Sequence, residues 1–425
     1  MFHELDSRIR KTQGNIKARV PISKGFYIFE EESEAENFWK THIPKDKHEK
    51  YLQYRKEWHR RPQECDPGEY PLSVIIELNS GCNLACNMCY TITDAFKESV
   101  VGDQRMMPWG MVCDIIDECE ELRVPSILFS WRGESTLYKS RDESTGKMKD
   151  FADVLQYARQ KENILEVTSL THGQNIDDGL AERIVKAQPN WISFSVDGMG
   201  NNYNQLRKPQ WARKAGEVPD VFSLVIKNIN KMKSIRDQLG LERPLIRSNT
   251  VYPAIADDPY GYRQYLKDAG VDLVTVNELL EWSLHNDGKI DMKYVEEDWS
   301  CQYPFQRLTV SANGTIVPCN GAVHEESGLV VGIYSSTFNQ GATKQTTAND
   351  SQVLNHAKRY SLREAWLSKE LQYIREMHSS NRRLEVDPGC RNCNHGLKKK
   401  GVAWIPENWN MDSLEWEVES RESDA

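Results

Sequence analysis

Six short apolar runs, rich in β-branched residues and separated by amphipathic stretches, constrain the fold of this chain more than any other feature. They lie at residues 74–78, 126–130, 164–169, 192–196, 246–252 and 273–276. Such runs are typical of buried strands, and strands that alternate with helices are typical of a parallel sheet. The sequence therefore predicts an α/β fold, either a parallel βα barrel or an open doubly wound sheet.

The stretches between these runs carry helical signals. One has Pro108 near its first turn and apolar residues at Val112, Ile115, Cys119 and Leu122, a spacing of three to four positions. Further helices are expected at residues 151–160, 178–187, 221–239 and 261–269. In βα barrels the active site lies at the C-terminal ends of the strands. We therefore expect the functional side chains in the loops that follow the six runs.

The alternation occupies only the middle of the chain, which predicts three parts. Residues 1–71 are polar, with helical patterns at 34–40 and 47–58, and are expected to form a mostly helical N-terminal extension. Residues 72–282 hold the alternating pattern. Residues 283–425 are rich in Asn, Gly, Ser and Thr and end in an acidic tail from Asp412, so we expect a smaller C-terminal domain there.

Composition narrows the setting of the protein. No apolar run approaches the roughly 18 residues of a membrane span, and the N-terminus lacks the charged-then-apolar pattern of a signal peptide. We therefore expect a cytoplasmic protein without a membrane partner. The net charge of −9 argues against broad binding of nucleic acid. In a reducing compartment the ten cysteines are expected to be metal ligands or buried thiols.

Three of these cysteines form a compact motif in the loop after the first run. Cys82, Cys86 and Cys89 stand as Cys-x-x-x-Cys-x-x-Cys, followed by Tyr90. Each iron of a [4Fe–4S] cluster normally takes one thiolate, so three thiolates leave one iron open to bind a small molecule. Zinc and simple buried thiols are the alternatives. Zinc usually takes four protein ligands in a structural site, and residues 81–90 contain no His, Asp or Glu.

This loop resembles that of the radical S-adenosylmethionine (SAM) superfamily. In that family the open iron binds the amino and carboxylate groups of SAM, and electron transfer cleaves SAM to a 5′-deoxyadenosyl radical. The resemblance implies a partial (βα)6 barrel over residues 72–282, a [4Fe–4S] cluster that binds SAM, and a contact between SAM and Tyr90. It also implies a reductant such as flavodoxin or ferredoxin.

The segment after the second run supports the same resemblance. Gly133 and Glu134 match part of the Gly-Gly-Glu-Pro-like motif whose backbone and acid contact the SAM amino group, while Arg132 and Ser135 depart from that motif. A glycine here permits close approach of the backbone. The plain alternative is that Gly133-Glu134 forms only a turn.

Further candidates follow the third and fourth runs. Ser195 lies in a Ser-x-Asp-Gly segment that resembles the one whose serine reaches the SAM carboxylate or ribose. Arg207 is a candidate partner for the SAM carboxylate through its bidentate guanidinium group. His172 stands where relatives usually have asparagine, and it either faces the cavity or is a satisfied loop residue. The alternatives to these SAM contacts are a simple turn at Asp197-Gly198 and a surface role for Arg207. The sequence does not identify a catalytic acid or base.

Four more cysteines occur in the C-terminal region: Cys301, Cys319, Cys390 and Cys393. Their order resembles the SPASM/twitch extension of radical SAM enzymes, in which such cysteines ligate an auxiliary cluster. The resemblance implies one auxiliary [4Fe–4S] cluster with all four irons held by protein. Structural zinc is the alternative, because four cysteines that include a Cys-x-x-Cys pair also suit zinc. Spacing alone does not decide between them.

The same resemblance implies hydrogen-atom abstraction from a substrate. The Trp131-Arg-Gly-Glu segment and residues 54–58 look like those of members that act on sugars, aminocyclitols or glycan precursors by oxidation, epimerisation or dehydration. A small polar substrate is therefore expected. The alternative is modification of a precursor peptide, although residues 1–70 lack the strand-rich pattern of a winged-helix peptide-binding module. A zinc- or cluster-stabilised scaffold without catalysis is the alternative of another class.

Overall fold

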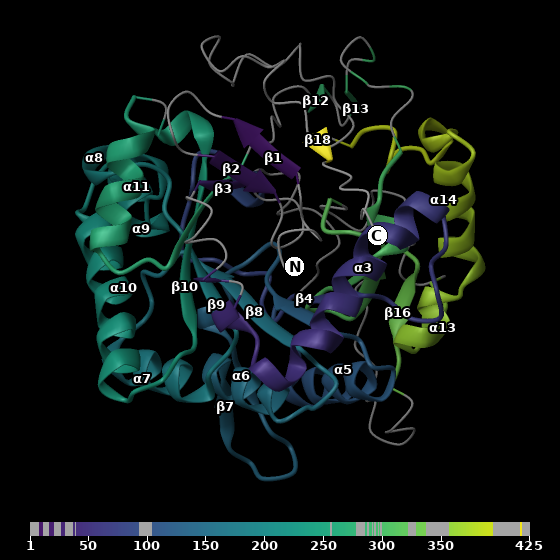
Figure 1. Cartoon of the computed structure of the whole chain (residues 1–425), viewed down its shortest axis with the longest axis horizontal. Helices are drawn as coiled ribbons and strands as arrows, with labels where there is room; N and C mark the ends of the chain where they lie inside the picture. Colours follow the sequence, from purple (N-terminus) through teal and green to yellow (C-terminus); the bar gives the residue numbers. More distant parts are fainter. Residues whose placement is uncertain are drawn as a thin grey trace, which may run out of the picture. The chain divides into compact units, whose positions relative to one another are not determined.

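A computed structural model gives the fold of the chain (Figure 1). It describes residues 8–11, 17–20, 27–29, 37–38, 40–92, 104–255, 257–277, 285–286, 289–290, 292, 295, 297, 300–321, 329–336, 357–393 and 417–418. Contacts divide the chain into two compact units. The first comprises Met1–Lys56, Leu170–Leu279 and Val402–Ala425, and the second comprises Glu57–Ser169 and Leu280–Gly401.

The second unit contains four parallel strands in the order β14, β4, β5 and β8. These are β14 (Arg307–Val310), β4 (Ser73–Ile76), β5 (Ser126–Phe129) and β8 (Glu166–Thr171), and the chain passes to the first unit within β8. Two antiparallel strands continue from β14, namely β15 (Thr315–Val317) and β16 (Gly332–Tyr334), and β17 (Arg359–Tyr360) pairs parallel with β16. Every residue of β4, β5 and β14 is buried, as expected of parallel strands covered on both faces.

The first unit contains the remaining parallel strands. These are β9 (Trp191–Ser195), β10 (Leu245–Val251) and β11 (Leu273–Asn277), with β10 in the middle. Three short strands, β1 (Arg8–Lys11), β2 (Lys17–Val20) and β3 (Tyr27–Phe29), pair antiparallel with one another, and β3 pairs antiparallel with β11. The last strand, β18 (Glu417–Val418), pairs with β1. All six predicted strands are thus present, and each lies within two residues of its expected start.

Helices connect the parallel strands, and carboxylates or hydroxyls cap most of their N-termini. In the second unit these are α5 (Trp109–Glu121) and α6 (Phe151–Arg159), followed in the C-terminal region by α13 (Leu362–Trp366) and α14 (Lys369–Ser379). In the first unit they are α7 (Asp178–Ala187), α8 (Gly200–Leu206), α9 (Gln210–Ala215), α10 (Val221–Gln238) and α11 (Pro259–Asp268). Asp150 caps α6 in a capping box, and Asp177, Asp220 and Asp258 cap α7, α10 and α11. The five predicted helices are confirmed.

Shorter elements complete the description. The hairpin β6 (Lys139–Arg141) and β7 (Met148–Asp150) and the pair β12 (His285–Asn286) and β13 (Lys289–Ile290) stand apart from the main strands. The 3-10 turns are η1 (Lys45–Lys47), η2 (Tyr90–Ile92), η3 (Ser135–Leu137), η4 (Tyr252–Ile255), η7 (Tyr303–Phe305) and η9 (Arg383–Glu385).

The N-terminal region is helical in part, as predicted, but it also contains strands. Helix α3 (His48–Glu64) covers the predicted pattern at 47–58, and the described residues 37–38 and 40–42 are helical too. The sequence predicts no strand before residue 72, whereas β1, β2 and β3 lie there. Strands of three or four residues at a sheet edge are formed by backbone pairing and leave too short a pattern to recognise. The predicted boundaries at residues 71 and 282 stay a prediction.

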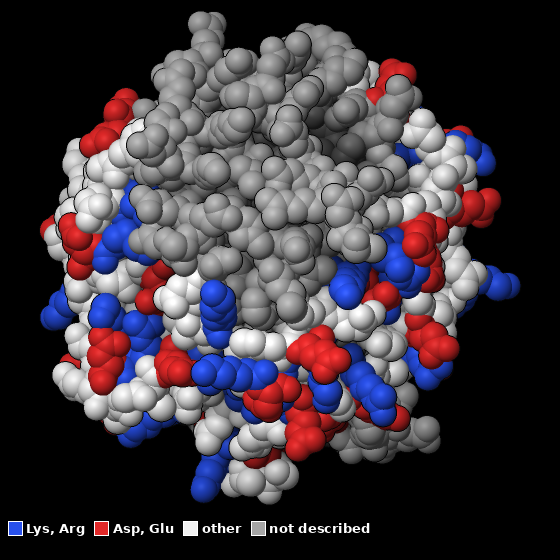
Figure 2. Space-filling model, viewed as in Figure 1, with Lys and Arg blue, Asp and Glu red and all other residues white. Residues whose placement is uncertain are grey.

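Some expectations fall outside the described residues, including the tail from Asp412 apart from β18. Within the described part of the chain, no helix is both long and apolar enough to cross a membrane. On the described part of the face in Figure 2, Lys and Arg side chains are interspersed with Asp and Glu side chains. The expected absence of membrane and nucleic-acid partners stays a prediction.

Candidate active site and auxiliary cluster site

The cysteine loop follows β4, and Cys86 and Cys89 lie within electrostatic reach of the Cys82 thiol. The backbone N–H of Leu84 donates to Cys82 Sγ at 3.4 Å, and the N–H of Cys89 donates to the carbonyl of Cys86 at 3.0 Å. Burial raises the pKa of the Cys82 thiol to about 12, and the neighbouring Glu134, Cys86 and Cys89 add to this shift. Burial and mutual repulsion disfavour the ionised form of these thiols. A cation is needed to hold them as thiolates, and the irons of a cluster supply that positive charge.

Gly133 fits against the start of this loop without room for a side chain. A Cβ atom at Gly133 would lie 2.1 Å from the carbonyl oxygen of Asn79 and 2.6 Å from that of Gly81. The Glu134 N–H donates to the Gly81 carbonyl at 3.0 Å, and Asn79 Nδ2 donates to the carbonyls of Gly81 and Glu134 at 2.9 and 3.3 Å. The expected close backbone approach at Gly133 is therefore present, and it fastens the Gly-Glu segment to the cysteine loop.

Glu134 is buried beside the cysteine loop. Its Oε1 accepts hydrogen bonds from the N–H and hydroxyl of Thr136 at 3.1 and 2.6 Å, so it caps η3. The charge of Glu134 also acts on Cys82, which places the carboxylate near the cysteine loop. Tyr90 begins η2 directly after Cys89 and is half-buried. The contacts of Glu134, Gly133 and Tyr90 with SAM stay predictions.

The departure from the family motif at Arg132 has a structural reason. Arg132 Nε and Nη2 each donate to a different carboxylate oxygen of Glu77 at 2.8 Å, and the side chains are 0% and 1% exposed. Glu77 also accepts the backbone N–H groups of Arg132 and Ala312 at 3.2 and 3.1 Å. Sequence reasoning missed this pair, although Glu77 is an acid inside an apolar run and so carried a signal. The pair holds the backbone that presents Gly133.

The first unit contributes the other candidates, at the end of β9. Ser195 is the last residue of β9 and is half-buried. Arg207 Nε and Nη2 both lie 2.5 Å from Asp197 Oδ2, and Asp197 Oδ1 accepts the N–H of Val251 at 2.9 Å. Asp197 therefore connects Arg207 to β10, which is a role in addition to the turn that the sequence suggests for Asp197-Gly198. The contacts of Ser195 and Arg207 with SAM stay predictions.

His172 is held within its own loop. It is buried, and its Nδ1 accepts the N–H of Gln174 at 3.0 Å while Asn175 Nδ2 lies 3.4 Å from its Nε2. These contacts favour the plain alternative, in which His172 orders the loop after β8.

The four C-terminal cysteines gather within the second unit. Cys301 precedes η7, Cys319 follows β15, and Cys390 and Cys393 follow η9. Burial raises the pKa of the Cys301 and Cys390 thiols, and Cys319 and Cys393 add to both shifts. The four thiols therefore lie within electrostatic reach of one another, although they come from three separate segments.

The surroundings of these thiols suit an iron–sulfur cluster. Arg307 is 2% exposed, its charge acts on Cys301, and its Nε and Nη2 atoms have no hydrogen-bond partner in the described part of the chain. A negatively charged cluster would compensate this buried cation, whose presence the sequence does not reveal.

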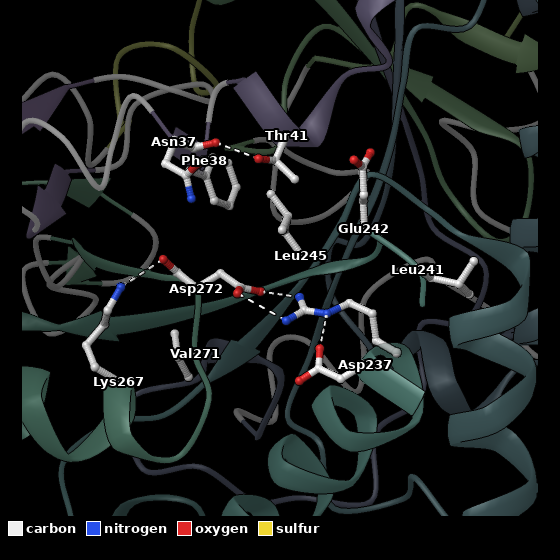
Figure 3. Close-up of a pocket in the computed structure, with 11 residues that line it drawn as sticks. Asn37, Phe38, Thr41, Asp237, Leu241, Glu242, Leu245, Lys267, Val271 and Asp272 are labelled. Atoms are coloured by element: carbon white, nitrogen blue, oxygen red, sulfur yellow. Dashed lines mark hydrogen bonds and ion pairs between the residues drawn. The ribbon is translucent and has the colours of Figure 1, made fainter. Parts of the chain in front are cut away.

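A separate hollow of about 370 Å³ in the first unit does not belong to either site (Figure 3). Leu245 begins β10, and Asp272 precedes β11, so the hollow lies at the N-terminal ends of these strands. Arg236 Nη1 lies 2.5 Å from Asp272 Oδ2, and Lys267 Nζ donates to the Asp272 carbonyl at 3.0 Å. The charges of Arg236 and Asp272 in this hollow are already paired with each other, and the hollow lies at the opposite end of the strands from Ser195. We therefore assign the hollow a structural role.

Comparisons with known proteins agree with this geometry. The model of the radical SAM superfamily matches residues 76–235, and that of the SPASM iron–sulfur cluster-binding domain matches residues 301–394. A "tungsten-containing aldehyde ferredoxin oxidoreductase cofactor-modifying protein" of Pyrococcus furiosus is 22% identical over 230 residues. That match covers 52% of this chain and 56% of the relative, so the chain spans about half the length of the curated relative that it matches.

Solved structures with a similar course of the chain include two SAM complexes. BtrN in complex with AdoMet and 2-DOIA has 14% sequence identity and a TM-score of 0.42, with 76% of this chain and 92% of that chain covered. Native anSMEcpe with bound AdoMet has 15% identity and a TM-score of 0.48, with 81% and 95% covered.

Proposed function

Because this chain is a radical SAM iron–sulfur enzyme with a C-terminal SPASM domain, we propose that it abstracts a hydrogen atom from a small polar substrate. A sugar, an aminocyclitol or a related glycan precursor is the proposed substrate class, with oxidation, epimerisation or dehydration as the outcome. The bound cluster and SAM supply the 5′-deoxyadenosyl radical that begins this chemistry. An electron donor such as flavodoxin or ferredoxin is proposed as the reductant.

One observation carries the proposal: three thiols, a Gly-Glu segment and a buried carboxylate meet after β4 and β5. Cys82, Cys86 and Cys89 would hold three irons and leave the fourth for SAM. Glu134, fixed by Thr136 and near Cys82, would accept a hydrogen bond from the SAM amino group. Ser195 and Arg207 are proposed to contact the SAM carboxylate or ribose, and Tyr90 is proposed to lie against SAM.

The four C-terminal cysteines are proposed to ligate one auxiliary [4Fe–4S] cluster. Four thiolates for four irons leave no iron open to substrate. We therefore assign Cys301, Cys319, Cys390 and Cys393 to electron transfer or to holding the C-terminal domain in place, and not to direct substrate binding.

Two observations support a small substrate. The N-terminal strands add to the sheet of the first unit through the pairing of β3 with β11, so the described part of this region is not a separate peptide-binding module. The name of the curated relative also describes the modification of a cofactor. Modification of a precursor peptide is the second candidate, since peptide-modifying enzymes share the same pair of domains.

The test uses the full chain, purified anaerobically with iron and sulfide and incubated with SAM and dithionite. Formation of 5′-deoxyadenosine above the substrate-free rate is expected with deuterated hexoses or aminocyclitols, together with transfer of deuterium into 5′-deoxyadenosine. The variant with Cys82, Cys86 and Cys89 all changed to Ala should lose about four irons and all cleavage. Cys65→Ser, at an exposed cysteine outside both sites, is the matched control.

Two results would count against parts of this proposal. Cleavage of SAM by the triple cysteine variant would overturn the cluster assignment. Deuterium transfer from a panel of labelled peptides, with none from the sugars or aminocyclitols, would replace the small substrate by a peptide.

A further inference from the structure

A buried histidine connects two of the four C-terminal cysteines. His378 lies in α14 and is 2% exposed. The backbone N–H of Cys301 donates to its Nδ1 at 3.0 Å, and its Nε2 lies 3.4 Å from the Sγ of Cys390. The hydroxyl of Ser300 donates to the carbonyl of His378 at 2.7 Å. The imidazole ring is therefore fixed at both nitrogens and at its backbone.

These contacts determine where the ring carries its proton. Nδ1 accepts a hydrogen bond from a backbone N–H, so it holds no proton. A neutral imidazole must then carry its proton on Nε2, which faces Cys390 Sγ. The N–H of His378 therefore points to a sulfur, within the range of a hydrogen bond to a sulfur acceptor.

We propose that His378 is a positioning residue that raises the reduction potential of the auxiliary cluster by donating its Nε2–H to the thiolate of Cys390. The inference rests on the proposed ligation of that cluster by Cys390. It goes beyond ligation because His378 is not one of the four thiolates and takes no iron in this arrangement.

The physical reason is the change in charge on reduction. The added electron makes the cluster and its sulfur ligands more negative, so a hydrogen bond to a ligand sulfur stabilises the reduced form more than the oxidised form. Two buried arginines act in the same direction. Arg383 is 1% exposed and donates to the Cys390 carbonyl at 2.6 Å, and Arg307 acts on Cys301. The backbone N–H of Tyr303 also donates to Cys301 Sγ, at 3.5 Å, and His378 is a neutral side chain that reaches the sulfur of Cys390.

The test measures the potential of the auxiliary cluster by itself. The full chain with Cys82, Cys86 and Cys89 changed to Ala retains only the C-terminal cysteines as cluster ligands. A redox titration followed by electron paramagnetic resonance gives the midpoint potential in this background, with and without His378→Phe. We expect His378→Phe to make reduction about tenfold less favourable, which is a fall of about 59 mV for one electron.

A second variant and a control separate the hydrogen bond from packing. His378→Gln keeps one donor and one acceptor, so it should restore part of the potential that His378→Phe loses. His42→Phe changes another fully buried histidine, which stacks on Phe38 in the first unit, and should leave the potential unchanged. With His378 present, exchange into D2O should reveal a deuteron coupling to the reduced cluster that His378→Phe removes. The backbone N–H of Tyr303, which donates to Cys301 Sγ at 3.5 Å, should contribute equally in both proteins.

Each failure has its own signature. An unchanged potential in a cluster-loaded His378→Phe variant overturns the inference. The absence, with His378 present, of any deuteron coupling beyond that of the Tyr303 N–H also overturns it, and this second result does not require the variant to assemble. Tightly bound zinc in place of iron in the parent chain overturns the proposed auxiliary cluster itself, and the inference falls with it.

Discussion

Replacing Arg132 by Met should destabilise the second unit strongly, because it leaves the Glu77 carboxylate buried without its cation. The two side chains are 0% and 1% exposed and share two hydrogen bonds of 2.8 Å. After the change, only the backbone N–H groups of Arg132 and Ala312 remain as donors to Glu77 in the described contacts. Breaking a buried pair from one side costs about 3–5 kcal/mol. For a unit of this size, that corresponds to a fall in Tm of roughly 10 °C.

The assay is thermal unfolding of the anaerobically reconstituted chain, followed by circular dichroism. A double variant, Glu77→Gln with Arg132→Met, removes both charges while the glutamine oxygen still accepts a backbone N–H. It should therefore melt above Arg132→Met alone, which an additive pair of changes would not do. Lys186→Met is the matched control, because the Lys186–Glu182 pair is 58% and 53% exposed and such pairs contribute less than about 1 kcal/mol. If Arg132→Met has the same Tm as the Lys186→Met control, the conclusion that Arg132 and Glu77 form a buried ion pair whose loss is costly is refuted.

Three further predictions concern Gly133, Glu134 and Glu118. Gly133→Ala should lower the iron content of the SAM site and abolish SAM cleavage, since its Cβ would lie 2.1 Å from the Asn79 carbonyl; normal iron and turnover would show that the loop can move aside. Glu134→Gln should weaken SAM binding roughly ten- to hundredfold, because hydrogen bonds to charged groups contribute about 1.5–3 kcal/mol, with the cluster spectrum unchanged; equal affinity by titration would reduce Glu134 to a helix cap. Burial raises the pKa of the Glu118 carboxyl above its ordinary 4.5, so its contribution to stability is full below pH 4.5 and is lost as the pH rises through the raised value. Glu118→Gln should therefore raise Tm relative to the original chain at pH 8 more than at pH 4, and parallel Tm curves would contradict this.

The parallel strands could be predicted from the sequence because burial on both faces demands continuous apolar runs. Val74, Ile75 and Ile76 illustrate this, since all three are almost fully buried in β4. The cysteine motif could be recognised from the sequence as a candidate cluster site, because an open cluster site needs its thiols at fixed short spacings. Both the apolar runs and the cysteine spacing are local patterns, so neither depends on contacts between residues that are distant in the sequence.

The remaining features depend on contacts between distant segments. The partner of Arg132 is 55 positions away, and His378 lies 77 positions from Cys301, so no local pattern connects them. The strands β1 to β3 are only three or four residues long, β1 and β2 are rich in basic residues, and the three strands join the sheet through the pairing of β3 with the backbone of β11. Apolar periodicity reports burial but does not report which polar groups find one another.

The pairing of β14 with β4 has a consequence for how this enzyme can be recombined. Ile76 of the radical SAM region pairs with Val310 of the cluster-binding region, and Glu77 accepts the N–H of Ala312. The SPASM region is therefore not a cassette that could be exchanged among relatives at a linker. A chimaera joined near residue 283 would expose an unpaired edge of β4 and remove a donor from Glu77. A graft should succeed only if the incoming segment carries a strand in the register of β14 and a backbone N–H at the place of Ala312.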